Sequence, residues 1–305
     1  MAKRHIPMIP GGLLQLVVLF PPPKPRDYTY FDGSDEHPFE GSATGHSPVN
    51  AWWLADFSLL AYEEEARAKA IIARQTSFDP ASLHWIESRG NTNTQALFVR
   101  GPAGAVLAFR GTEFPRPKAG FGYFGELLNM LKDVATDAQV ALVPWVGGDG
   151  PSVPVHRGMS DALRSVWDQV EPCLEDVGDN QLWLTGHSLG GSLATLLAYS
   201  RPEKLAGLYT FGALPVGGPE FAAEFGTAKD LLAKTCRYVH GKDPVPGLFD
   251  ILHQYEQVGP AMALPHSRRG PFAELVTKAP EALTGTDPLD HAPLFYCYET
   301  WNAFN

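Results

Sequence analysis

Cysteine is scarce in this sequence, and clusters of basic residues are missing. The three cysteines, Cys173, Cys236 and Cys297, lie far apart and form no CxxC pair. This spacing favours buried free thiols over a disulfide framework or a zinc site. No HExxH or similar spacing predicts a metal site, and we expect no cofactor. The formal net charge is −10, and without a lysine and arginine cluster it argues against nucleic-acid binding.

A long apolar run is also missing, although the N-terminal segment loosely resembles a signal peptide. Pro7 and Pro10 interrupt that segment, and three prolines at 21–23 stand where small cleavage-site residues are expected. The apolar run at 11–20 is too short to span a bilayer. We therefore expect no transmembrane segment and favour a cytoplasmic location over secretion. The sequence indicates no oligomeric state.

Strand-like and helix-like segments alternate in the second half of the chain. The length of 305 residues allows one large domain or two small ones, and we expect one. Strand-like runs at 181–185, 207–211 and 234–240 alternate with helix-like runs at 188–199 and 219–232. This alternation predicts an α/β fold with a mostly parallel central sheet and helices on both faces.

The first part of the chain divides by composition near residue 48. Residues 1–48 contain a stretch rich in Pro, Gly, Asp and Ser and are predicted to form an irregular N-terminal arm. The folded domain is predicted to extend over 49–305. Its first elements are expected to be helices at 49–62 and 63–72 and strands at 82–87, 94–100 and 104–110, the last two joined as a hairpin.

The sequence Gly186-His187-Ser188-Leu189-Gly190 matches the GxSxG pattern of a nucleophile elbow. An apolar strand-like run precedes it, and an alanine- and leucine-rich helix-like run follows it. Glycines on both sides of the serine let the backbone turn tightly between strand and helix. The pattern predicts the α/β-hydrolase fold, with Ser188 as a nucleophile at the carboxyl edge of the sheet.

A serine nucleophile needs an acid and a histidine, and this fold supplies them in the order Ser, Asp or Glu, His. Asp243 is the preferred acid because it lies in a loop directly after a strand-like run. Asp230 and Asp250 compete with it. The first is predicted to lie in a helix and the second beyond the sheet edge.

Three histidines follow the candidate acids. His253 lies in 252–258, which is predicted to be a strand, and His266 is expected in an exposed loop. His291 lies in a loop that could deliver an imidazole to the sheet edge. Position and chain order therefore favour His291 as the general base.

An oxyanion hole requires one amide from the residue after the nucleophile, here Leu189, and one from a loop after an earlier strand. Residues 109–112 end such a strand and contain a glycine. Thr112 is the candidate for the second amide, although a plain strand-terminating turn would explain the same residues.

Four segments, taken together, resemble the class 3 lipases, the fungal-type triacylglycerol lipase family of the α/β-hydrolases. The resemblance covers about residues 90–300, and the segment YTFG at 209–212 and the pair Asp290-His291 also fit. One departure is Val134, which stands where the family often has tryptophan. The four segments are FRGT at 109–112, VHRG at 155–158, TGHSLGG at 185–191 and DPVP at 243–246.

The resemblance implies a triad of Ser188, Asp243 and His291 with an oxyanion hole at Thr112 and Leu189. It also implies hydrolysis of carboxylic esters through an acyl-enzyme, preferably of triacylglycerols at a lipid–water interface. Short-chain carboxylesterase, phospholipase A1 and feruloyl esterase activities stay open on the same scaffold, as does a non-catalytic interaction protein.

The family places an amphipathic lid after the oxyanion strand, and residues 114–131 occupy that interval. Apolar residues there recur at mainly helical spacing, so we expect a lid. The same segment contains GxGxxG at 120–125, but no strand precedes it, which argues against a dinucleotide site.

Overall fold

The computed structural model describes residues 3–4, 28–102, 104–112, 141–147, 151–175, 177–179, 181–228, 230–266 and 285–305. The predicted lid at 114–131, the glycine-rich run at 120–125 and most of the arm before residue 28 lie outside these residues. Among the helices that are described, none combines the length and apolar character that a membrane crossing requires.

A seven-stranded sheet forms the centre of the molecule, with strand order β1-β2-β3-β6-β7-β8-β9. The pairs β1–β2 and β2–β3 are antiparallel, and every pair from β3 to β9 is parallel. The mostly parallel sheet and the early hairpin were both predicted and are confirmed. The strands are β1 His84–Glu87, β2 Gln95–Gly101, β3 Gly104–Phe109, β6 Leu182–His187, β7 Leu205–Phe211, β8 Thr235–His240 and β9 Ala261–Leu264.

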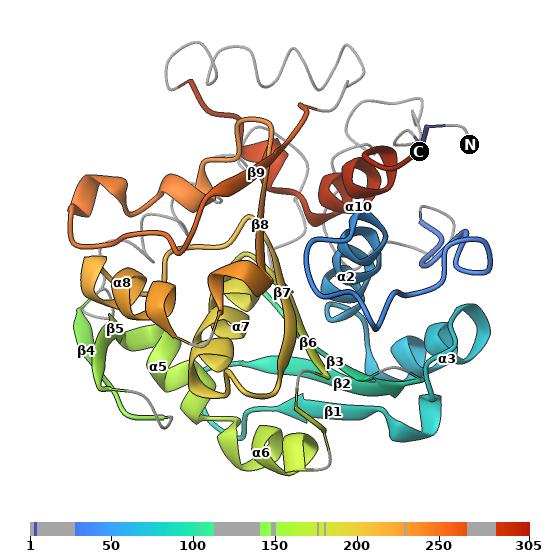
Figure 1. Ribbon diagram of the computed structural model, residues 1–305, viewed down its shortest axis with the longest axis horizontal. Coiled ribbons are helices and arrows are strands. Elements are labelled where there is room, and N and C mark those ends of the chain that lie inside the picture. Colours follow the sequence, from blue (N-terminus) through green and yellow to red (C-terminus); the bar gives the residue numbers. More distant parts are fainter. Residues whose placement is uncertain are drawn as a thin grey trace.

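Helices cover both faces of this sheet (Figure 1). Helix α2 (Pro48–Leu60) packs with α10 (Pro293–Asn302) on one face, while α7 (Leu189–Ser200), α5 (Arg157–Arg164) and α8 (Pro219–Thr227) lie on the other. Helix α2 is buried along nearly its whole length, which agrees with its broad apolar face. Helices α3 (Glu65–Gln75) and α6 (Trp167–Glu175) lie nearer the antiparallel edge.

A second, two-stranded sheet consists of β4 (Leu142–Trp145) and β5 (Val153–His156) and was not predicted. Pro144 pairs with Pro154 in this hairpin. Proline cannot donate to a strand ladder, so sequence rules reject such segments as strands. Here the two prolines pair with each other in a short hairpin outside the large sheet.

Two sequence-based predictions between β7 and β9 are wrong. Residues 252–258 form no strand: His253 is left-handed (φ 51°), and Tyr255 and Val258 are both buried. Burial three residues apart cannot come from the two-residue alternation of a strand. Helix α8 ends at Thr227, not at 232, because Ala228 is extended, and Asp230 lies in a turn beyond it.

Residues 28–47 are irregular, but their aromatic side chains belong to the core. Tyr28 and Phe31 are buried, and Asp56 on α2 accepts hydrogen bonds from the Tyr28 hydroxyl and from the Phe31 amide, the latter at 2.6 Å. Tyr30 donates to Glu63 at 2.9 Å. The hydrophobic core therefore includes residues before position 49, and the predicted division at 48 stays a prediction.

Candidate active site

Ser188 lies between the end of β6 and the start of α7 with a positive φ of 57° and a ψ of −129°, outside the left-handed helical region. A non-glycine residue in this region carries backbone strain that the surrounding structure must hold. The turn leaves no room beside the serine. A Cβ on Gly186 would overlap the Gly190 carbonyl and come within 2.6 Å of the Gly191 nitrogen. This is the geometry that the GxSxG pattern predicts.

The strand that precedes Thr112 packs directly against this elbow. A Cβ on Gly190 would overlap the Phe109 carbonyl oxygen, and one on Gly111 would lie 3.3 Å from the Cβ of Ser188. Thr112 follows Gly111 and is partly exposed, as is Leu189 at the start of α7. The candidate oxyanion residues therefore flank the serine from two different segments.

Asp243 and His291 meet in the folded chain although 48 residues separate them. Asp243 lies just after β8, where its Oδ1 accepts from the Val245 amide at 2.8 Å. Its Oδ2 lies 2.9 Å from Nδ1 of His291, and both side chains are fully buried. A carboxylate accepts this bond, so His291 carries its proton on Nδ1.

A backbone hydrogen bond links the serine to the end of β7, which this pair also approaches. The Ser188 amide donates to the Phe211 carbonyl at 2.9 Å. Gly212, the next residue, is left-handed (φ 62°), and a Cβ there would lie 2.7 Å from Asp243 Oδ2 and 3.0 Å from His291 Nδ1. Glycine at 212 thus lets the Asp243 and His291 side chains approach the end of β7.

His187 contacts His291 from the nucleophile side. Their ring centroids lie 4.5 Å apart, and Nε2 of His187 lies 2.7 Å from the His291 carbonyl oxygen. Burial, and next the nearby His291, hold the pKa of His187 well below its usual value, so the ring is neutral. Its Nε2–H donates to the carbonyl, and its Nδ1 accepts from the Tyr62 hydroxyl at 3.0 Å.

Tyr296 on α10 holds Asp243 from the other side. Its hydroxyl donates to Asp243 Oδ2 at 2.5 Å and accepts from the His240 amide at 3.1 Å. Burial, and next the charge of Asp243, raise the pKa of Tyr296 well above its usual value. The phenol therefore stays protonated as a donor.

The competing candidates lie in other segments of the chain. Asp230 lies in the turn after α8, and Asp250 lies at the start of a 3₁₀-helix, Asp250–Leu252. His253 follows that helix. His266 is partly exposed, as expected, but its Nδ1 lies 2.8 Å from Asp290 Oδ2.

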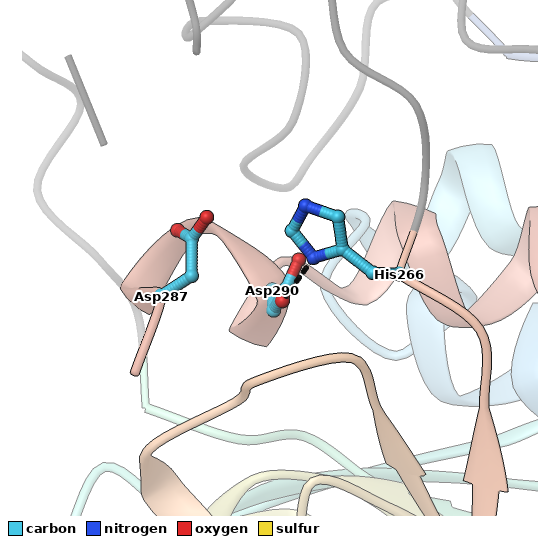
Figure 2. Close-up of side chains that lie close together, drawn as sticks. All are labelled: His266, Asp287 and Asp290. Atoms are coloured by element: carbon cyan, nitrogen blue, oxygen red, sulfur yellow. Dashed lines mark hydrogen bonds and ion pairs between the residues drawn. The ribbon is translucent and has the colours of Figure 1, made fainter. Parts of the chain in front are cut away.

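One group of side chains in the described part of the chain has ligand atoms close enough for a metal ion: His266, Asp287 and Asp290, within 4.8 Å of one another (Figure 2). Figure 2 shows His266 turned toward Asp290, to which it is hydrogen-bonded, with the carboxylate of Asp287 nearby. Asp290 precedes His291 on a 3₁₀-helix, Pro288–His291, and Asp287 is the N-cap of that helix.

Sequence reasoning missed Tyr62, His240 and Tyr296, and it gave no role to His187. Only His187 carried a signal, because it lies inside the GxSxG pattern itself. The other three contact the site through pairs that are distant in sequence, which a local pattern does not reveal.

Residues 106–252 match the family model described as lipase (class 3). The chain belongs to the class 3 lipase family. Among curated proteins, it is similar to monoglyceride lipase of Mus musculus, with 33% identity over 121 residues. The aligned region covers 39% of this chain and 38% of that protein. The chain is 42% identical over 112 residues to secreted mono- and diacylglycerol lipase 1 of Fusarium solani, covering 35% and 33%.

The alignments thus span little more than a third of the length of these curated relatives. Solved structures share the fold of this chain. A mono- and diacylglycerol lipase from Aspergillus oryzae superposes with a TM-score of 0.58 at 16% identity, covering 84% of this chain and 98% of that one. A mutant MDLA from Penicillium cyclopium gives 0.50 at 20% identity, covering 72% and 80%.

Proposed function

We propose that this protein hydrolyses carboxylic esters of acylglycerols through an acyl-enzyme, with Ser188 as nucleophile, His291 as general base and Asp243 as the acid that orients the imidazole. The observation that carries the proposal is the buried hydrogen bond of 2.9 Å between His291 Nδ1 and Asp243 Oδ2. It fixes the tautomer that a general base needs, at the sheet edge where Ser188 occupies a strained turn.

In the acylation step, the Ser188 Oγ attacks the ester carbonyl carbon while its proton passes to Nε2 of His291. The C=O π electrons move onto the carbonyl oxygen to give a tetrahedral oxyanion. Collapse of this intermediate re-forms the C=O bond and breaks the bond to the leaving oxygen. His291 returns its proton to that oxygen, so the alcohol departs neutral and the acyl group stays on the serine.

The oxyanion is proposed to lie between the amides of Leu189 and Thr112. The Leu189 amide is at the N-terminus of α7, where the helix dipole favours negative charge. Gly111 packs closely on Ser188, which supports the amide of Thr112, the next residue, as the second donor. Each such donor contributes about 10²- to 10³-fold in rate in related chemistry.

In deacylation, a water molecule takes the place of the alcohol. His291 removes its proton as the hydroxyl attacks the acyl carbon, and then returns that proton to Ser188 Oγ as the acid product leaves. Asp243 stays ionised and stabilises the imidazolium that forms in each half-reaction. Tyr296 and the Val245 amide hold this carboxylate in place.

Acylglycerols are proposed as the substrates because the matched relatives are named for monoglycerides and for mono- and diacylglycerols. These names favour partial glycerides over the triacylglycerols that the sequence resemblance suggests. Rates on mono-, di- and trioleoyl glycerol emulsions, together with a chain-length series of p-nitrophenyl esters, would separate these classes from a short-chain esterase.

The direct test is Ser188→Ala, assayed on dioleoyl glycerol and on p-nitrophenyl butyrate. Turnover should fall by about 10⁴-fold or more. Ser192→Ala is the matched control: Ser192 lies one turn along α7, is also buried, and donates to the Leu214 carbonyl at 2.8 Å. It should keep its turnover. Equal turnover in the two variants would contradict the proposal.

A further inference from the structure

Asp290, the residue before His291, lies fully buried where three segments meet. Its Oδ2 accepts from the Lys242 amide at 2.7 Å and from His266 at 2.8 Å. Lys242 follows β8. His266, drawn beside Asp290 in Figure 2, follows β9. The carboxylate thus joins the segment of the proposed base to the segment that carries Asp243.

The peptide groups around His291 are held in a matching way. His240 Nδ1 lies 3.0 Å from the Asp290 carbonyl oxygen, and His187 Nε2 lies 2.7 Å from the His291 carbonyl oxygen. Burial lowers the pKa of both rings, so each acts as a neutral donor. Two consecutive carbonyls of the base segment are therefore fixed by imidazoles from the ends of β8 and β6.

Gly241 shows that the loop is shaped for the Asp290 carboxylate. It is left-handed (φ 50°), and a Cβ there would overlap Oδ2 of Asp290. A side chain at 241 would therefore exclude the carboxylate from the Lys242 amide. Close approach of backbone and carboxylate is a standard reason for glycine in a turn.

We propose that Asp290 is a positioning residue: it locks the backbone of His291 against the Asp243 loop, so that the imidazole is held at one place relative to both Asp243 and Ser188. This inference rests on the proposed function. Catalysis by a general base is sensitive to displacements of about 1 Å, which can reduce rate by about 10²-fold. Loss of Asp290 should therefore lower kcat and leave substrate binding intact.

The test is Asp290→Ala, compared with Asp290→Asn and with Asp287→Ala as the matched control. Asp287 is equally buried at the N-cap of the same short helix, and its Oδ1 accepts from the Leu289 amide at 3.0 Å. It meets the Asp243 loop through its backbone amide, which donates to the Lys242 carbonyl at 2.9 Å and which the Asp287→Ala substitution keeps. Asp290→Ala should reduce kcat by about 10- to 100-fold with KM within about twofold. Asp290→Asn, which keeps one acceptor for the Lys242 amide, should recover part of kcat.

Asp287→Ala should lower the unfolding midpoint, because it removes a helix N-cap, and should keep kcat within about twofold. All variants are assayed at a temperature where near-UV circular dichroism shows them folded. If Asp290→Ala lowers the midpoint as Asp287→Ala does and leaves kcat unchanged, Asp290 is merely structural and the inference fails.

A second pair of variants tests the geometry. Gly241→Ala should lose kcat as Asp290→Ala does, because the methyl group displaces the carboxylate. The double variant should lose no more than the Asp290→Ala single variant, since the displaced group is already absent. Multiplied losses in the double variant would overturn the inference.

Two further measurements distinguish the positioning role from a cation site and from a failure of the proposed triad. Wild-type activity should be unchanged by EDTA; if chelation reproduces the loss seen with Asp290→Ala, then His266, Asp287 and Asp290 hold a cation and the positioning role is wrong. Turnover by Ser188→Ala would instead refute the proposed function. An inactive Ser188→Ala beside a fully active Asp290→Ala refutes only this inference.

Discussion

Replacing Gly190 with alanine should push the nucleophile elbow away from the strand that leads to Thr112. A Cβ at this position would overlap the Phe109 carbonyl oxygen and lie 2.8 Å from the Phe109 carbonyl carbon and 2.9 Å from the Arg110 carbonyl carbon. All of these are backbone atoms, which no side-chain rotation can move aside. An ordinary contact begins near 3.4 Å, so one backbone must shift by about 0.6 Å (3.4 minus 2.8) or more.

Two opposing effects set the stability of this variant. Alanine in a helix interior is favoured over glycine by about 1 kcal/mol, and overpacking of a tight contact costs about 1–3 kcal/mol. We expect a net loss of up to about 2 kcal/mol. Activity should fall further, because the shift separates Ser188 from the Thr112 amide, and a misplacement approaching 1 Å can lower kcat/KM by about 10²-fold.

Gly226→Ala on α8 is the matched control for Gly190→Ala. Its Cβ would meet only Leu232 Cδ1, at 3.5 Å, so the variant should gain up to about 1 kcal/mol. Urea unfolding and p-nitrophenyl butyrate kinetics are measured for both variants. If Gly190→Ala matches Gly226→Ala in unfolding midpoint and in kcat/KM, the packing argument for the elbow is refuted.

Burial raises the pKa of Asp56 to about 6, above about 3.9 in the unfolded chain. Its contribution to the free energy of unfolding should therefore fall by about 3 kcal/mol as pH rises from about 3 to about 7. Urea unfolding across this pH range should show the wild type losing stability relative to Asp56→Asn; parallel curves would contradict this. Tyr296→Phe leaves Asp243 and the His240 amide without the phenol, so we expect a loss of about 1–3 kcal/mol in unfolding free energy and about a tenfold lower kcat. Unfolding and ester assays check both, and a variant unchanged in both would exclude the assigned role of Tyr296.

The part of the site that is local in sequence was predictable. Strand, elbow and helix are consecutive around Ser188, so the glycines at 186 and 190 carry the information for that geometry. The position of Asp243 was predictable, because the residue follows a strand of a parallel sheet and the carboxyl ends of such strands meet at one edge.

The supports of the site were not predictable, because they depend on contacts between distant segments. Tyr296 reaches Asp243 across 53 residues, and Tyr62 reaches His187 across 125. A buried polar pair of this kind leaves neither a periodic pattern nor a local motif in the sequence. The strand pair β4–β5 was missed for another reason: Pro144 and Pro154 lie in it, and proline is disfavoured in strands because it cannot donate a backbone hydrogen bond.

Labelling with a fluorophosphonate, followed by mass spectrometry of the modified peptide, tests the central claim most directly. The account predicts one adduct, on the Oγ of Ser188, and a labelling rate that falls by about 10²- to 10⁴-fold in His291→Ala. An adduct on another residue, or a rate at Ser188 that does not depend on His291, would contradict it.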